Sequence, residues 1–307
     1  MTRVWVRPEI IEVARGLPLV FDLDGVVVDV RATYRRAYGM GVAWVLKQHG
    51  IAVRRGGPFP VAAVHALRRH PGFNAPADTL AFLLRAALVE AVRAPGQPVT
   101  GRHLPAWIAA ALATGQLDAW REALAAELLP GSETWVAERE DVTAASRATH
   151  EAYAGSDAVL AMYGHVPVRR LKGLQFRDRL LLDPQRPPPP RPLAVYTGRT
   201  HGEALSLLNR FKLFRDVPAD CIETTDTGAR KPDPAPLLRL DTRLGGRGLV
   251  YLGDTEADRQ TVLAFRRERP GVPCVCVQVV LRARAGRWPE ADLAGVAPDS
   301  LLDALDP

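Results

Sequence analysis

Short apolar runs that end in polar residues recur along the chain and predict buried strands. The run Leu17–Phe21 is too short for a helix and is bounded by turn residues, and similar runs begin at Leu193 and Leu249. A further run over 273–277 carries Cys274 and Cys276, which face the same side of the predicted strand because side chains alternate. Strands of this kind favour a parallel sheet covered by helices on both faces.

The middle of the chain has a helical pattern instead. The segment 76–88 is apolar all round and predicts a mostly buried helix, and 104–114 and 117–129 predict further helices that end at glycine or proline. The tract 183–192 is rich in proline and predicts a stiff extended connector back to the core. A proline ligand for a recognition module is the alternative for this tract.

Together these patterns predict an α/β fold with two domains. The core is a doubly wound parallel sheet formed by residues 1–30 and 186–307, and an all-helical domain of residues 31–185 is inserted into it. A length of 307 residues allows about two domains.

The composition is that of an ordinary globular protein, with 47% hydrophobic and 24% charged residues. The net charge is +6, but the arginines are spread along the chain, which argues against nucleic-acid binding and favours a mildly positive cleft for anionic metabolites. No apolar run is long enough to span a membrane, and the first residues lack the apolar region of a signal peptide, so we expect a cytoplasmic protein. The three cysteines fit buried thiols better than zinc ligands.

The first predicted strand leads directly into two carboxylates, in Phe21-Asp22-Leu23-Asp24-Gly25. Open α/β sheets bind their ligands at the carboxyl ends of strands, and Gly25 lets the chain turn so that both acids can serve one pocket. Two acids this close repel each other, and a bound divalent cation would offset that repulsion. An Asp-x-Asp alone is often only a turn.

Two further elements offer groups that bind anions. Thr197 follows the strand that begins at Leu193; its hydroxyl can donate to an oxyanion, and Gly198 lets backbone N–H groups approach. Lys231, in Arg-Lys-Pro-Asp-Pro, is one of only four lysines, and its point charge suits a phosphate. The alternatives are a plain turn for the first element and an exposed loop for the second.

The strand that begins at Leu249 opens onto two more acids, Asp254 and Asp258. A helix beginning near residue 255 would project both toward the strand end, because they are four residues apart. The alternative is that these two acids are only an N-cap residue and an acid of the first helical turn.

In this order the four elements resemble the motifs of the haloacid dehalogenase superfamily, which run D-x-D, Ser/Thr, Lys and G-D-x-x-x-D. All four are intact, and the resemblance covers the predicted core. It implies a phosphatase that hydrolyses a small phosphorylated metabolite through an aspartyl-phosphate intermediate and uses Mg²⁺.

The resemblance also implies a role for each acid of the core. Asp22 is the nucleophile, and Asp24 is the general acid and base. Magnesium is held by Asp22, by the backbone carbonyl of Asp24 and by Asp254. Asp258 supports the metal through water or orients Lys231.

By the same resemblance, the phosphoryl oxygens are bound by Thr197, by a backbone N–H near Gly198 and by Lys231. An acid at position 24 argues against a dehalogenase, because a halide leaving group needs no proton. A phosphomutase on the same core, or a non-catalytic binding protein on a retained hydrolase fold, stays open as an alternative. The physiological ester and the oligomeric state are left open as well.

The inserted helical domain resembles the cap of subfamily I, although it is longer than the usual cap. The segments Asp24–Arg35 and Pro71–Asn74 resemble a bacterial and archaeal subgroup with the patterns D-G-V-L-V-D-V, S-Y-R and G-G-F-N, and Pro71 replaces the first glycine. This resemblance makes Arg35 and Asn74 candidate substrate contacts.

Overall fold

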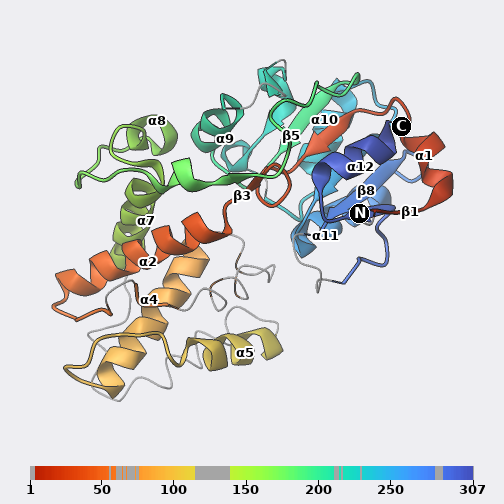
Figure 1. Cartoon of the computed structure of the whole chain (residues 1–307). Helices are drawn as coiled ribbons and strands as arrows, with labels where there is room; N and C mark the ends of the chain where they lie inside the picture. The colour runs from red at the N-terminus through yellow and green to blue at the C-terminus, as the bar shows by residue number, and fades with distance from the viewer. Residues whose placement is uncertain are drawn as a thin grey trace. The chain divides into compact units, whose positions relative to one another are not determined.

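The chain forms two compact units, which Figure 1 shows together. The computed structural model describes residues 4–54, 57–59, 64, 67, 73, 76–114, 139–210, 214–215, 217–228, 230–280 and 286–306. The core unit consists of Met1–Val30 and Asp178–Pro307, and the helical unit consists of Arg31–Arg177.

A seven-stranded sheet organises the core unit, in the order β1-β9-β8-β7-β2-β5-β6. Its neighbouring strands are parallel except β1 and β9, which are antiparallel. The predicted strands that begin at or near Leu17, Leu193, Leu249 and Pro273 are confirmed as β2, β5, β7 and β8. The strands are β1 (Val4–Val6), β2 (Leu19–Phe21), β5 (Leu193–Tyr196), β6 (Ile222–Glu223), β7 (Leu249–Gly253), β8 (Cys274–Val279) and β9 (Leu293–Gly295).

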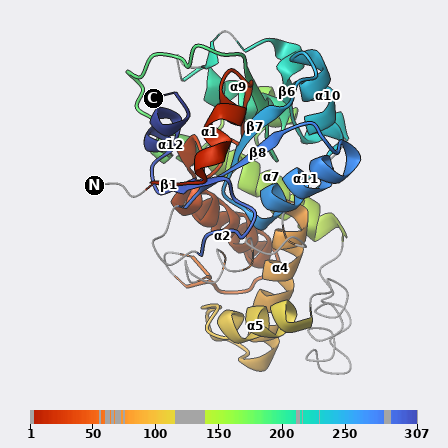
Figure 2. The ribbon, with the colours of Figure 1, turned by 90° about the vertical axis from the view of Figure 1, so that its right-hand side faces the viewer.

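Helices flank this sheet, as predicted for a doubly wound α/β fold (Figure 2). On one face, Val20 and Tyr251 share an apolar cluster with Leu237 and Phe265, and both Cys274 and Cys276 lie in it as free thiols. Phe21 points to the opposite face and meets Phe214 edge-on, with ring centroids 5.2 Å apart. The helices are α1 (Pro8–Ala14), α9 (His201–Leu208), α10 (Ala235–Arg243), α11 (Glu256–Glu268) and α12 (Pro298–Leu305), with short 3-10 turns η5 (Ala219–Cys221) and η6 (Thr225–Thr227).

The helical unit is built around the packing of α2 on α7. Gly41 lets these helices approach closely, since a Cβ at this position would lie 2.1 Å from Thr149 Oγ1. Tyr34 and Tyr153 stack beside this contact, with ring centroids 4.6 Å apart. Its elements are α2 (Arg31–Gln48), α4 (Pro76–Arg93), α5 (Leu104–Thr114), α7 (Arg139–Ala154), α8 (Val159–Tyr163) and η3 (Leu174–Arg177).

Two of the predicted helices of this unit are confirmed, because α4 contains 76–88 and α5 coincides with 104–114. The helix predicted over 117–129 lies outside the described residues. In the part of the chain that the structure describes, none of the helices is both long and apolar enough to cross a bilayer.

A short antiparallel ribbon brings the chain back to the core unit. β3 (Val28–Asp29) pairs with β4 (Arg179–Leu180), with Val28 opposite Leu180. Because of this pairing the returning segment belongs to the core unit from Asp178, ahead of the sequence-based boundary between residues 185 and 186.

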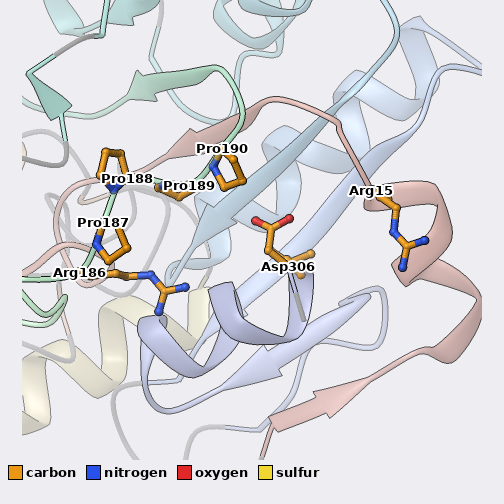
Figure 3. Close-up of a pocket in the computed structure, with 8 residues that line it drawn as sticks. Arg15, Arg186, Pro187, Pro188, Pro189, Pro190 and Asp306 are labelled. Carbon is orange, nitrogen blue, oxygen red and sulfur yellow. The ribbon is translucent and has the colours of Figure 1, made fainter.

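The proline-rich tract lies on the core unit next to α12. Pro187–Pro190 line a hollow of about 510 Å³ together with Arg15, Arg186, Leu305 and Asp306 (Figure 3). Arg191 follows the prolines and is buried; its guanidinium donates to the carbonyls of Ala14 (2.9 Å), Leu17 (3.2 Å) and Leu305 (3.1 Å) and pairs with Asp306. The Arg191 side chain thus connects the tract to α1 and the residues after it and to the last residues of α12.

Replacement of Arg191 tests how much these hydrogen bonds contribute to the stability of the core unit. Arg191→Met removes the guanidinium donor from three buried carbonyls, of which Ala14 keeps a second donor, the Leu17 N–H at 3.1 Å. The variant should cost about 3 kcal/mol, because removing one partner of a buried charged contact is strongly destabilising. We expect the melting temperature of the core unit to fall by about 6–12 °C. Arg15→Met is the matched control, since Arg15 is 61% exposed and, among the described residues, forms an ion pair only with Glu12. This variant should change the melting temperature little. Equal effects of the two variants would contradict this role of Arg191.

Candidate active site

The strand ends of β7, β2 and β5 lie side by side at one edge of the sheet. Phe21 is in register with Val195 on one side and with Leu252 on the other. The residues that follow these strands therefore emerge together, as expected for a parallel sheet. The sequence elements that begin at Asp22, Thr197 and Asp254 are brought to one place by this register.

Asp22 is held at the end of β2 by its neighbours. Its N–H donates to the Leu252 carbonyl (2.9 Å), and its Oδ1 accepts from the Leu23 N–H (2.7 Å). The Lys231 Nζ lies 3.0 Å from the same oxygen. Burial raises the pKa of Asp22 to about 7, although Lys231 acts in the opposite direction. The carboxylate thus carries its charge in this site only with help from nearby cations.

Lys231 lies between two carboxylates and two aromatic rings. Its Nζ is 2.7 Å from Asp258 Oδ1 as well as 3.0 Å from Asp22, and it lies 5.1 Å and 5.5 Å from the ring centroids of Tyr196 and Tyr251. Burial alone would lower the pKa of Lys231, but the two carboxylates raise it. The residue is therefore a firmly positive charge at the strand ends.

Asp258 is the best satisfied acid of the site. Its Oδ1 accepts from the Tyr251 hydroxyl (2.7 Å), and its Oδ2 accepts from the Thr255 N–H (2.9 Å) and hydroxyl (2.6 Å). Thr255 and Asp258 form a capping box at the start of α11. Burial alone would raise the pKa of Asp258, but Lys231 and these hydrogen bonds lower it. This arrangement anchors the ammonium group of Lys231.

Asp254 lacks comparable partners. Its Oδ1 is buried and finds no hydrogen-bond partner within the described part of the protein. Burial, together with the charges of Asp258 and Asp22, raises the pKa of Asp254 well above its usual value. Carboxylate oxygens of Asp22, Asp254 and Asp258 lie within 4.8 Å of one another. Buried oxygen ligands with uncompensated negative charge fit a divalent cation, and Asp22 and Asp254 are the members of the cluster with capacity to bind it.

Two glycines, Gly25 and Gly253, make the close approach of these acids possible because they have no side chain. A Cβ on Gly25 would lie 2.1 Å from Asp254 Oδ2, and Gly25 has a φ of +81°, which favours glycine. A Cβ on Gly253 would lie 2.5 Å from the Cβ of Asp258. Both glycines flank the motif acids because the acids occupy the space that a side chain would need.

Asp24 has a partner that the sequence did not indicate. Its Oδ1 lies 2.9 Å from Nε and 2.7 Å from Nη2 of Arg199. Arg199 directly follows Thr197 and Gly198 and is 2% exposed, whereas Asp24 is 27% exposed. An arginine at a strand end beside a turn is unremarkable by pattern, and only the fold places it against Asp24.

Two of the predicted phosphate-binding residues, Thr197 and Gly198, lie in the loop between β5 and α9. Thr197 is buried and its N–H donates to the Glu223 carbonyl (3.0 Å), whereas Gly198 is exposed. Thr200 caps α9, which begins directly after this loop. A hydroxyl, a glycine and a helix N-terminus thus follow one another at the strand ends.

The two residues predicted as substrate contacts belong to the segment of the helical unit. Arg35 lies on α2 of the helical unit and is partly buried, and Asn74 lies outside the described residues. Both contacts stay predictions. Sequence reasoning also missed Tyr196 and Tyr251, which read as ordinary strand residues until Lys231 is placed between their rings.

Comparison with known proteins places the fold. No protein-family model matches the chain, and neither does any curated protein. The phosphatase Tt82 from Thermococcus thioreducens is 21% identical, with 93% of this chain and 98% of that chain covered, at a TM-score of 0.56. The structural-genomics target ZR25 is 14% identical, with 94% of each chain covered, at a TM-score of 0.59. At these identities the likeness shows a shared fold.

The raised pKa of Asp22 predicts a pH dependence of stability. Asp22 binds its proton more tightly in the folded protein than in the unfolded chain, so its contribution to stability falls as the pH rises from about 4 to about 7. In buffer with a chelator, Asp22→Asn should therefore melt above the wild type by about 5 °C or more at pH 8 and show a much smaller difference at pH 5. Asp303→Asn, at a 68% exposed position where the carboxylate pairs with Arg186, is the control and should not gain stability relative to the wild type as the pH rises. A difference between Asp22→Asn and wild type that does not vary with pH would contradict this assignment.

Proposed function

We propose that this chain, whose fold is that of the haloacid dehalogenase superfamily, is a magnesium-dependent phosphatase that hydrolyses small phosphate monoesters. The observation that carries the proposal is the meeting of Asp22, Asp254, Asp258 and Lys231 at the ends of neighbouring strands. These residues come from distant parts of the sequence, and each has the chemistry that phosphoryl transfer needs. The cytoplasmic location stays a prediction.

Asp22 is the nucleophile in this proposal. Its carboxylate attacks phosphorus and forms an aspartyl-phosphate, and the ester oxygen leaves. The Lys231 ammonium, 3.0 Å away, favours the charged form of Asp22. A magnesium ion bound by Asp22, Asp254 and the backbone carbonyl of Asp24 would offset the charge of the carboxylate and of the incoming phosphate.

The remaining residues bind and exchange protons. Asp24 protonates the leaving oxygen and later takes a proton from the attacking water. Thr197, a backbone N–H near Gly198 and Lys231 bind the phosphoryl oxygens as negative charge builds up on them. Asp258 holds Lys231 in place through the 2.7 Å contact with its ammonium group.

The helical unit acts as a cap in this proposal. It covers the site during the first step and carries the groups that select the ester. Arg35 and Asn74 are the substrate contacts that we propose for it. A substrate small enough to be enclosed, such as a phosphorylated metabolite, suits a capped site.

The direct test is phosphate release from a panel of esters with added magnesium. Asp22→Asn removes the nucleophile and should lower the rate at least about 1,000-fold, as loss of a nucleophile does in other hydrolases. Arg186→Gln is the matched control, because Arg186 pairs with Asp303 on α12 and should leave the rate unchanged. Full activity of Asp22→Asn would refute the nucleophile. No release from any ester would favour a binding protein, and a need for a bisphosphorylated activator would favour a phosphomutase.

The role of Asp24 predicts a dependence on the leaving group. Asp24→Asn should slow hydrolysis of an alkyl phosphate about 100-fold or more, because the alkoxide needs a proton. It should slow p-nitrophenyl phosphate much less, because nitrophenolate leaves without one. For each ester, kcat/KM of the wild type is divided by kcat/KM of the variant, and the two ratios are compared. The same loss for both esters would show that Asp24 is not the general acid.

A further inference from the structure

Arg199 lies beside the proposed phosphate-binding residues but has no role in the scheme above. Its carbonyl accepts hydrogen bonds from the N–H (3.0 Å) and hydroxyl (3.1 Å) of Thr225, which fixes its backbone between β5 and α9. Its own N–H is 3.4 Å from Thr197 Oγ1. With a side chain only 2% exposed, its guanidinium is a buried positive charge next to the proposed phosphate site.

A buried guanidinium needs an anion beside it, since an uncompensated charge in the interior is strongly unfavourable. Without substrate, Asp24 meets this need with contacts of 2.7 Å and 2.9 Å to its Oδ1. Asp24 is 27% exposed, so its carboxylate can also be solvated by water when the contact is broken. The pair is therefore asymmetric: Arg199 requires an anion, whereas Asp24 does not require Arg199.

Lys231 cannot serve an entering phosphate alone. Its ammonium group is already shared by Asp22 and Asp258, at 3.0 Å and 2.7 Å. Arginine has a planar fork of N–H donors that matches phosphate oxygens and binds them more strongly than a neutral donor does. A phosphate dianion beside Thr197 therefore competes with Asp24 for Arg199.

We infer that Arg199 exchanges partners during the reaction cycle. It holds Asp24 while the site is empty, and it binds the phosphoryl group of the substrate when the site is filled, which frees the Asp24 carboxylate. This makes Arg199 a phosphate-binding residue in addition to those that the motifs indicate. The inference rests on the proposed function, because it takes a phosphoryl group to be the anion that enters.

A double-mutant cycle with inorganic phosphate tests the exchange. Binding is measured by calorimetry on the full chain with magnesium, for wild type, Asp24→Asn, Arg199→Gln and the double variant. Asp24→Asn should tighten phosphate binding about tenfold, because Arg199 no longer has to leave a carboxylate. Arg199→Gln should weaken binding about tenfold, and in its background the gain from Asp24→Asn should largely vanish.

Two results would overturn the exchange. An equal gain in phosphate affinity from Asp24→Asn in the wild-type and Arg199→Gln backgrounds would mean that Asp24 only repels the anion. Unchanged phosphate affinity in Arg199→Gln would mean that Arg199 only positions Asp24. Arg186→Gln, whose arginine pairs with Asp303, is the control and should bind phosphate as the wild type does. If Arg199→Gln does not fold, Arg199→Met, which also removes the positive charge, replaces it. A gain in phosphate affinity from Asp24→Asn that is undiminished in the Arg199→Met background would again overturn the exchange.

The cycle separates this inference from the proposed function. If the double-mutant cycle shows coupling but no ester is hydrolysed, the phosphatase proposal is refuted and the exchange is supported. Hydrolysis with an additive cycle would refute only the exchange. No phosphate binding in any of the four proteins would overturn the inference.

Discussion

The core site depends on one electrostatic constraint, which is that several carboxylates share a small buried volume. Lys231 meets part of this constraint through its contacts with Asp22 and Asp258 at 3.0 Å and 2.7 Å. Burial still raises the pKa values of Asp22 and Asp254, so the available positive charge is less than the negative charge that the acids would carry. The shortage is a property of the site itself, and it makes the site receptive to a divalent cation.

The site divides its two buried cations between different acids. Lys231 is fixed by Asp258, which is itself held by Tyr251 and Thr255, so the ammonium group has little freedom. Arg199 is held by Asp24, a partly exposed carboxylate. Lys231 is thus a fixed charge and Arg199 an exchangeable one, and only the fixed charge is preorganised for the transition state.

The features that were predictable from sequence are local ones. Apolar runs ending in Asp22, Thr197 and Asp254 mark the strand ends, and the parallel sheet then brings these residues together, as the structure confirms for the fold. The contact between Arg199 and Asp24 joins residues 175 positions apart and has no periodic pattern behind it. Tyr251 was hidden for the same reason, because a strand tyrosine looks alike whether its hydroxyl is idle or bound to Asp258. The return point at Asp178 depends on the pairing of β3 with β4, and both strands are too short to leave a signal.

This short pairing of β3 with β4 also shapes how the protein can change over evolution. Val28 lies opposite Leu180, although the whole helical unit lies between them in sequence. A segment whose two ends are clamped side by side behaves toward the sheet as a loop, and the entropy of closing a loop grows only slowly with its length. Insertions, deletions or wholesale exchange of the helical unit therefore leave the strand order undisturbed, so new substrate preferences can arise without rebuilding the chemistry at the strand ends.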